Sequence, residues 1–153
     1  MTRIVNGIDH LNEIRTLILE YVKFLGRDLA FQGIQAELDD LRGKYTPPHG
    51  RILAALSDES RVVGCVAYYR HSQTRCEMKR LYVKPEYRSL RLGSRLIETL
   101  IDEARADGYE EMVLDTVREL RSAIRLYERL GFVETAPYYA NPMPDVIYMR
   151  QAL

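Results

Sequence analysis

The sequence predicts a mixed α+β fold built on one central, mostly antiparallel sheet. Some stretches carry apolar residues at helical spacing, and other short runs are rich in β-branched and aromatic residues. Strand-like runs follow one another in the first half, which indicates hairpins, and a strand–helix–strand unit comes later. The chain has 153 residues, of which 46% are apolar and 29% charged, as in one globular domain. Without repeats or a linker, residues 1–153 are expected to form a single domain.

The first half of the chain is predicted to contain a strand, two helices and then three strands. Apolar residues from Leu11 to Leu25 fall at helical spacing. A shorter stripe runs from Phe31 to Leu41, with acidic residues on its outer side. Pro and Gly make residues 44–50 a loop. The expected strands are 2–6, 51–56, 62–69 and 74–83.

The second half is predicted to begin with a long amphipathic helix, Leu92–Ala106. Its apolar residues lie on one stripe, which is the face expected to pack on the sheet. A short apolar strand, another helix and two closing strands follow at 112–116, 119–130, 132–135 and 146–152. The order of strand, helix and strand around Leu92–Ala106 is the expected βαβ unit, flanked by helices.

Charge and hydropathy exclude some classes of partner. Lys plus Arg equals Asp plus Glu, with 22 of each, so the formal net charge is zero. General nucleic-acid binders are usually basic, so no nucleic-acid partner is expected. The N-terminus lacks the apolar centre of a signal peptide, and no apolar run approaches transmembrane length. We therefore expect a cytoplasmic protein that has no membrane contact.

The two cysteines, Cys65 and Cys76, fall on adjacent predicted strands. Two cysteines without a partner pair make no zinc site, so no metal is expected. A cysteine nucleophile needs a nearby base, and the sequence shows no Cys/His arrangement. Both residues are expected to be buried, reduced thiols.

A basic loop at residues 84–91 precedes the helix Leu92–Ala106. It carries Lys84, Arg88 and Arg91, and Gly93 follows at the helix start. A helix N-terminus has unpaired N–H groups and a partial positive charge, so this unit favours a phosphate. Neither GxxxxGK[ST] nor GxGxxG is present, which disfavours a P-loop and a dinucleotide fingerprint. The alternative is an ordinary strand–helix turn that binds nothing.

This loop resembles the pyrophosphate loop of the GCN5-related N-acetyltransferase (GNAT) family, Q/R-x-x-G-x-G/A. Arg88 matches the opening Q/R and Gly93 the second glycine, and Ser94 follows directly. Arg91 stands where the family usually has its first glycine. Since glycine permits positive φ, Arg91 is expected to keep an ordinary backbone and to add charge instead.

A second segment, SAIRLYERLGF, resembles the family pattern A-x-x-x-Y-x-x-x-G-F. Ala123, Tyr127, Gly131 and Phe132 fit this pattern. The family often has Asn three residues before the alanine, where this chain has Leu120. The resemblance is good over about residues 62–132, and the tail resembles one bacterial subgroup of these acyltransferases.

The resemblance implies the GNAT fold and acetyl-CoA as cofactor. In the family, acyl-CoA lies where the fourth and fifth strands separate, with the pantetheine on the backbone of the fourth strand and the pyrophosphate on the loop. Carried over by position, the cofactor-binding residues are Leu81, Tyr82, Val83, Arg88, Ser89, Leu90, Arg91, Leu92, Gly93, Ser94 and Tyr127.

The resemblance also implies two catalytic residues. Glu77, on the fourth strand, is the candidate general base, and Tyr127, near the coenzyme sulfur in the family, is the candidate general acid. Strand alternation is expected to place Glu77, Lys79, Leu81 and Val83 on one face. The alternatives are that Glu77 only pairs with Lys79 or Arg75, and that Tyr127 only packs in the core.

The acceptor site is expected near the loop before the last strand. Tyr138, Tyr139 and Asn141 lie in this loop and are candidate substrate-binding residues, although they could serve only for packing. Arg80 is a candidate for an acceptor carboxylate, because arginine forms a bidentate fork, with a surface ion pair as the alternative. Asp115, at a strand end, is assigned no catalytic role.

Together these features predict an N-acyltransferase that passes acetyl from acetyl-CoA to a primary amine of a small molecule or peptide. Transfer would be direct, within a ternary complex. One alternative is a non-catalytic acyl-CoA-binding or regulatory module on the same fold, motivated by Arg91 and Leu120. Another is a small nucleotide-binding or interaction protein, which rests only on the basic loop. Edge strands in such folds often pair, so a homodimer is also a possibility.

Overall fold

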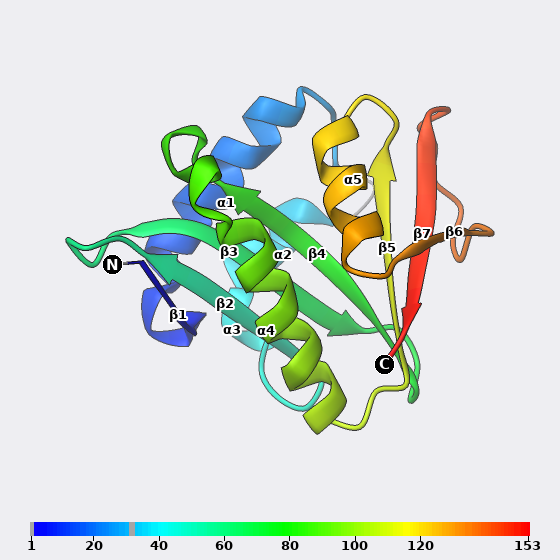
Figure 1. Cartoon of the computed structure of the whole chain (residues 1–153), viewed down its shortest axis with the longest axis horizontal. Helices are drawn as coiled ribbons and strands as arrows, with labels where there is room; N and C mark the ends of the chain where they lie inside the picture. Colours follow the sequence, from blue (N-terminus) through cyan, green and yellow to red (C-terminus); the bar gives the residue numbers. More distant parts are fainter. Residues whose placement is uncertain (1, 31–32) are drawn as a thin grey trace.

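One seven-stranded sheet organises the computed structural model, which describes residues 2–30 and 33–153 (Figure 1). The strand order is β1-β2-β3-β4-β5-β7-β6, and only the β4–β5 pair is parallel. This confirms the predicted mixed fold with a mostly antiparallel sheet. The strands are β1 Arg3–Asn6, β2 Gly50–Leu56, β3 Val62–Arg70, β4 Arg75–Val83, β5 Glu111–Val117, β6 Val133–Thr135 and β7 Val146–Ala152.

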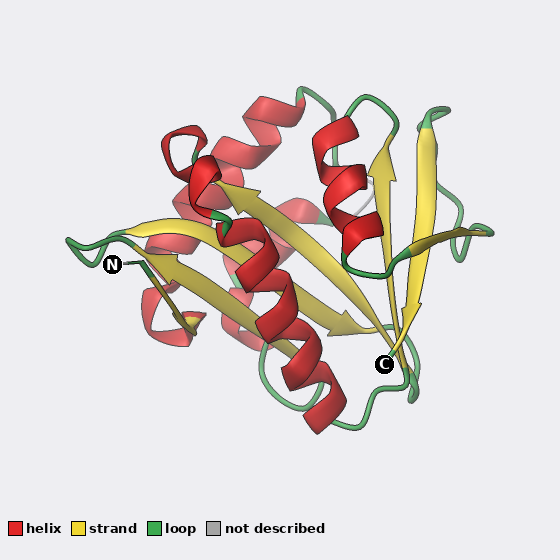
Figure 2. Cartoon of the chain, in the orientation of Figure 1, coloured by secondary structure: helices red, strands yellow, loops and turns green. Residues whose placement is uncertain are grey.

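Helices cover both faces of this sheet (Figure 2). The first three helices lie on one face, and α4 and α5 lie on the other. None of the described helices is both long enough and apolar enough to cross a membrane. The α-helices are α1 Leu11–Leu25, α2 Ile34–Asp39, α3 Leu41–Lys44, α4 Leu92–Ala106 and α5 Arg121–Arg129. Short 3-10 helices are η1 Gly7–His10 and η3 Pro85–Leu90.

The sequence predicted a single helix where the structure has α2 and α3. Asp40 interrupts the helix with a non-helical backbone, φ −149° and ψ 68°, and its side chain accepts a hydrogen bond from the Gly43 amide at 3.0 Å. Asp40 therefore begins a new helix rather than continuing the old one. Phe31, assigned to this helix from the sequence, lies outside the described residues.

The long helix α4 anchors one of the two cores. Its predicted apolar stripe is fully buried against β2, β3 and β4. Burying each such side chain contributes roughly 1.5–3 kcal/mol, so this helix is held rigidly on the sheet. The buried residues of the stripe are Leu92, Leu96, Ile97, Leu100, Ile101 and Ala104.

Strands β4 and β5 pair only over a short stretch and then separate. The paired residues run from Arg75 to Glu77 on β4 and from Glu111 to Val113 on β5. Figure 1 shows the two strands meeting at one end and diverging towards the other. Beyond Glu77, the backbone groups of β4 that face β5 have no sheet partner among the described strands, and buried backbone groups need one.

A β-bulge in β4 changes which side chains share a face. Arg80 has φ +62°, and the β3–β4 register shifts between Cys65 and Ala67. The expected alternation is therefore wrong beyond Lys79. Leu81 and Val83 join the core under α4, opposite the face on which Arg80 and Tyr82 lie.

The bulge is tied to helix α2 by a buried ion pair. Arg80 Nε donates to Glu37 Oε2 at 2.7 Å and Arg80 Nη2 to Glu37 Oε1 at 3.0 Å, while Lys44 Nζ lies 2.9 Å from Glu37 Oε1. The Glu37 and Arg80 side chains are 1% and 4% exposed. Glu37 thus points inward, contrary to the expected outer acidic face. The pair fixes α2 and the bulge relative to each other.

We predict that Glu37→Gln destabilises the fold, and that the loss depends on pH. Burial alone would raise the pKa of Glu37, but Arg80 and Lys44 outweigh it and lower this pKa from 4.5 to about 2. A depressed carboxyl pKa stabilises the fold above the unfolded-state value, and this contribution disappears as pH falls from about 4.5 to 2, a loss of about 3 kcal/mol. Glu37→Gln should therefore lower the free energy of unfolding at neutral pH by about 3 kcal/mol.

Urea unfolding of both proteins between neutral pH and acid tests this prediction. Asp39→Asn is the matched control, because Asp39 is an exposed acid on the same helix. The Glu37→Gln variant should show a shallower acid slope than the wild type. An equal acid slope in the two proteins would mean that the ion pair does not contribute as described.

Candidate active site

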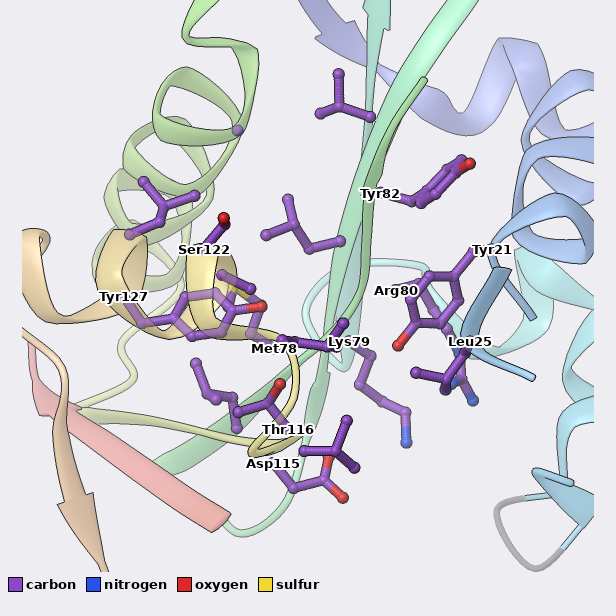
Figure 3. A pocket seen from close by; sticks show the side chains of 18 of the residues that line it. Tyr21, Leu25, Met78, Lys79, Arg80, Tyr82, Asp115, Thr116, Ser122 and Tyr127 are labelled. Carbon is purple, nitrogen blue, oxygen red and sulfur yellow. The ribbon is translucent and has the colours of Figure 1, made fainter. Parts of the chain in front are cut away.

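The gap between β4 and β5 contains a cavity of about 890 Å³. It passes through the sheet, so side chains from both helix layers line it. Figure 3 shows Tyr127 and Ser122 on the α5 side and Tyr21 and Leu25 on the α1 side. The cavity is thus shared by the two helix layers.

The start of α4 provides the basic end of this cavity. Arg91, Gly93 and Ser94 line it, and the first amides of α4 have no carbonyl partner within the helix. These free amides and the positive helix end favour an anion here. The structure thus places the predicted basic loop and helix start at one end of the cavity.

Arg91 does not keep the ordinary backbone that was expected of it. Its φ of +57° and ψ of +26° are left-handed, which is the conformation a glycine at this position would adopt easily. Arg91 therefore preserves the turn and adds a cation. Gly93 serves a different purpose, because a Cβ there would lie 3.1 Å from Leu126 Cδ2. Its small size lets α4 and α5 approach each other.

Most of the predicted cofactor-binding residues meet at the cavity. Those that line it are Leu81, Tyr82, Val83, Arg88, Arg91, Gly93, Ser94 and Tyr127. Three others do not line it. Leu92 is buried in the core, Leu90 is exposed on the surface, and Ser89 lies between Leu90 and Arg88 in the exposed turn.

Arg88 occupies one edge of the cavity and turns towards α1. Its Nε donates to the Val83 carbonyl at 2.9 Å, and its guanidinium lies 5.2 Å from the Phe24 ring and 5.5 Å from the Tyr82 ring. These contacts hold the loop after β4 against α1. They also leave a fixed positive charge near the basic end.

Tyr127 directs its hydroxyl into the cavity (Figure 3). Its ring packs edge-on against Phe132, with 6.0 Å between centroids. Tyr127 therefore both packs in the core, the alternative considered from the sequence, and lines the cavity. Burial, with smaller effects from Tyr21 and Asp115, raises the pKa of Tyr127 above its ordinary value. The phenol is therefore protonated at neutral pH, the state a proton donor needs.

The other predicted catalytic residue, Glu77, lies just beside the cavity rather than on its lining. Glu77 Oε2 accepts a hydrogen bond from the Tyr138 hydroxyl at 2.5 Å, and Glu77 Oε1 lies 3.7 Å from Lys79 Nζ. The contact with Lys79 is the pairing that was considered from the sequence as the alternative to a catalytic role. Arg80 lines the cavity, but its guanidinium is bound by Glu37 in a buried pair, not the surface pair considered from the sequence.

Asp115 is one of the charged cavity residues that sequence reasoning missed. It lies within β5 and lines the cavity, and it accepts hydrogen bonds from the Tyr139 hydroxyl and from Asn141 Nδ2, the latter at 3.2 Å. Burial raises the pKa of Asp115, and the Tyr139 hydrogen bond partly opposes this. The sequence did contain a signal for this role, since Asp115 stands among the apolar residues of its strand. A buried acid needs hydrogen-bond partners, which indicates a polar site around it.

The tyrosine-containing loop before β7 brings the two carboxylates into one network. Tyr138 binds Glu77 on β4, and Tyr139 binds Asp115 on β5. Tyr139 is in turn held by Asn141, whose Nδ2 lies 2.8 Å from its hydroxyl oxygen. The three residues predicted near the acceptor site thus contact the acids of the α1 side, although they do not line the cavity.

An ion pair joins the walls of the cavity on the α1 side. Both terminal nitrogens of Arg27 contact Asp145 at 2.7 Å, and Arg27 Nη2 contacts Glu119 at 2.9 Å. Arg27 follows α1, whereas Glu119 and Asp145 belong to the segments after β5 and before β7. Such exposed pairs contribute little stability, so their effect is to hold these three segments near one another.

The two cysteines take no part in this site. Cys65 and Cys76 are buried as expected, and burial raises the pKa of each thiol to about 12. Neither is therefore a thiolate at neutral pH. Within residues 2–30 and 33–153, no group of three or more His, Cys, Asp or Glu side chains could hold a metal ion.

Comparison with known proteins assigns this architecture. The acetyltransferase (GNAT) family model matches residues 17–132. A protein of Schizosaccharomyces pombe named as an N-acetyltransferase is 45% identical over 92% of this chain and 86% of its own length. The chain belongs to the GNAT family.

Solved structures of GNAT proteins share the fold. An acetyltransferase of Staphylococcus aureus has a TM-score of 0.84 at 19% identity, covering 99% of each chain. A GNAT acetyltransferase of Elizabethkingia anophelis, solved with acetyl-CoA bound, has a TM-score of 0.60 at 21% identity over 69% of this chain and 77% of its own. The expected bacterial subgroup is not supported, because the relative at 45% identity is a fungal protein.

We predict that Tyr139→Phe raises the pKa of Asp115 in this GNAT protein. The hydroxyl of Tyr139 donates to the carboxylate and lowers its pKa, so its removal leaves burial less opposed. Carbon-13 NMR titration of the aspartate carboxyls measures this directly. Tyr69→Phe is the control, because Tyr69 is exposed and donates to neither acid. An unchanged Asp115 titration would show that Tyr139 does not stabilise the carboxylate.

Proposed function

We propose that this GNAT protein transfers the acetyl group of acetyl-CoA to the primary amine of a small molecule or peptide. The observation that carries this proposal is the cavity between the separated strands β4 and β5, lined by side chains from both faces of the sheet. A thioester on the α4–α5 side and an amine on the α1 side would meet there. Residues 1–153 would act as one catalytic domain.

The features of the donor side fit acetyl-CoA. Backbone groups of β4 beyond Glu77 have no partner on β5, and we assign to this stretch the binding of the pantetheine amides and the polarisation of the thioester carbonyl. The first amides of α4, together with Arg91, fit a pyrophosphate. A cavity of about 890 Å³ falls in the size range of cofactor sites.

Acetyl transfer requires that the amine lose a proton and that the leaving thiolate gain one. We assign the donation to Tyr127, whose protonated hydroxyl faces the cavity. Glu77 is the assigned base and would act through a water molecule, because it lies beside the lining rather than on it. Neither cysteine lines the cavity, which favours direct attack in a ternary complex over a covalent enzyme intermediate.

We assign the predicted substrate-binding residues to the acceptor side of the cavity, which is the α1 side. Tyr138, Tyr139 and Asn141 would shape the acceptor side through the two carboxylates that they bind. Arg80 would act by holding the bulge of β4 in place rather than by binding an acceptor carboxylate. A homodimer and a cytoplasmic location stay predictions from the sequence. The sheet edges β1 and β6 are where a second copy could pair.

A screen of primary amines with acetyl-CoA tests the proposal by following thiol release. Continuous release that requires both the amine and the folded protein is the expected result. Binding of CoA without turnover for alkylamines, amino acids, polyamines and lysine peptides would instead support the non-catalytic module and contradict the transferase.

We predict that Tyr127→Phe lowers turnover by one or two orders of magnitude, roughly the lower part of the range for general acid catalysis. The substitution removes only the hydroxyl, so the ring contact with Phe132 stays and CoA binding should be unchanged. The measurement is kcat by thiol release, with the CoA-induced thermal shift as the control for folding and binding. Wild-type kcat in the variant would remove Tyr127 from the mechanism.

We predict that Arg91→Gly weakens CoA binding by about tenfold, the effect expected for losing one charge-assisted contact of about 1.4 kcal/mol. Glycine keeps the left-handed turn, so the substitution separates charge from backbone geometry. Calorimetric titration with CoA at two salt concentrations measures this loss, which should shrink at high salt. Tighter binding by the glycine variant would show that backbone strain at Arg91 outweighs its charge.

A further inference from the structure

Lys79 is the one lysine of the chain that lines the cavity. The sequence contains four lysines, at 23, 44, 79 and 84, and all four lie within the described residues. The remaining basic residues on the lining are arginines, which stay protonated and are not nucleophiles near neutral pH. A primary amine therefore already stands inside the cavity that we assign to amine acetylation.

Lys79 also lies where the strands begin to separate. It comes two residues after Glu77, the last residue of β4 that pairs with β5. Figure 3 shows it between Tyr127 on one side of the gap and Tyr21 and Arg80 on the other. The side chain leaves β4 on the α1 side, towards Leu25 and Asp115, which is the side that we assign to the acceptor.

The surroundings of Lys79 favour a reactive amine. Its side chain is 13% exposed, and its nearest anion, Glu77 Oε1, lies 3.7 Å away, beyond hydrogen-bond distance. Burial lowers the pKa of Lys79, and the positive charges of Arg80 and Lys44 lower it further, whereas Glu77 and Glu37 oppose this. Asp115 also interacts electrostatically with Lys79. A larger fraction of the side chain is therefore the neutral, nucleophilic amine than for an exposed lysine.

We propose that Lys79 is an internal acceptor, so that the protein loaded with acetyl-CoA acetylates itself at Lys79 Nζ. The inference rests on the proposed function, because it needs the bound thioester. The neutral Nζ attacks the thioester carbonyl carbon, a C–N bond forms and the C–S bond breaks. The ammonium form loses one proton to reach the neutral amine, and the attacking nitrogen loses a second. One of these protons ends on the CoA thiolate and the other is released to solvent through Glu77 or water.

The test incubates the full chain with acetyl-CoA and no added amine. Intact mass and peptide mapping then give the acetylation rate at each of the four lysines. Exposed Lys23 is the internal control, since uncatalysed acetylation favours accessible amines. We expect Lys79 to react faster than Lys23 by on the order of tenfold or more, because it is held beside the thioester. Excess CoA should suppress acetylation of Lys79 and leave Lys23 unchanged.

Two matched variants sharpen the result. Lys79→Arg keeps the charge and removes the nucleophile, so the rapid acetylation should vanish, whereas Lys23→Arg should leave it intact. The rate at Lys79 should not depend on protein concentration, as an intramolecular step requires. A rate that rises with protein concentration would overturn the inference, because the acetyl group would then come from another copy.

The remaining outcomes separate this inference from the proposed function. If acetyl-CoA raises the unfolding temperature but Lys79 reacts no faster than Lys23, the internal acceptor is refuted and the transferase proposal stands. Acetylation of Lys79 that excess CoA does not suppress would also refute it. If acetyl-CoA neither binds nor acetylates, both proposals fail together.

Discussion

The separation of β4 from β5 is the constraint on which the site depends. The two strands pair over three residues each, and the bulge at Arg80 then redirects β4. The left-handed backbone of Arg80 is unfavourable for a non-glycine residue, and the buried pair with Glu37 holds it there. Helix α2 is thereby attached to the strand that separates from β5 beyond Glu77. Arg80 therefore links the packing of α2 to the shape of β4 at the cavity.

The cavity that results has two ends of different character. The α4 end offers free amides and arginine side chains, which suit phosphates. At the α1 end, Lys79, Glu77 and Asp115 lie close to one another. Tyrosine hydroxyls of the loop before β7 donate hydrogen bonds to the two acids. A polyanionic donor and a cationic acceptor would therefore be drawn to opposite sides of the same gap. Tyr127 lies between them and keeps its proton because it is buried.

Sequence patterns predicted the sheet, the long helix and the basic loop, because these follow from local periodicity and charge. The loop and the Tyr127 segment also carried the family resemblance. What failed depended on tertiary contacts. The bulge at Arg80 has no signature in the sequence, so strand alternation misplaced Leu81 and Val83. Glu37 looked like an outer acid because its partner Arg80 is 43 residues away. The place of Asp115 in the site depends on its hydrogen bond with Tyr139, a residue 24 positions away in another loop.

The most direct test of the central claim is thermal unfolding with CoA, acetyl-CoA and ATP added separately at equal concentration. A ligand that binds only the native state stabilises it, by about 2.7 kcal/mol at a hundred times its Kd. The cavity between β4 and β5 predicts a higher midpoint with CoA and with acetyl-CoA and no change with ATP. No shift with either CoA species at saturation, or a shift with ATP alone, would contradict the account.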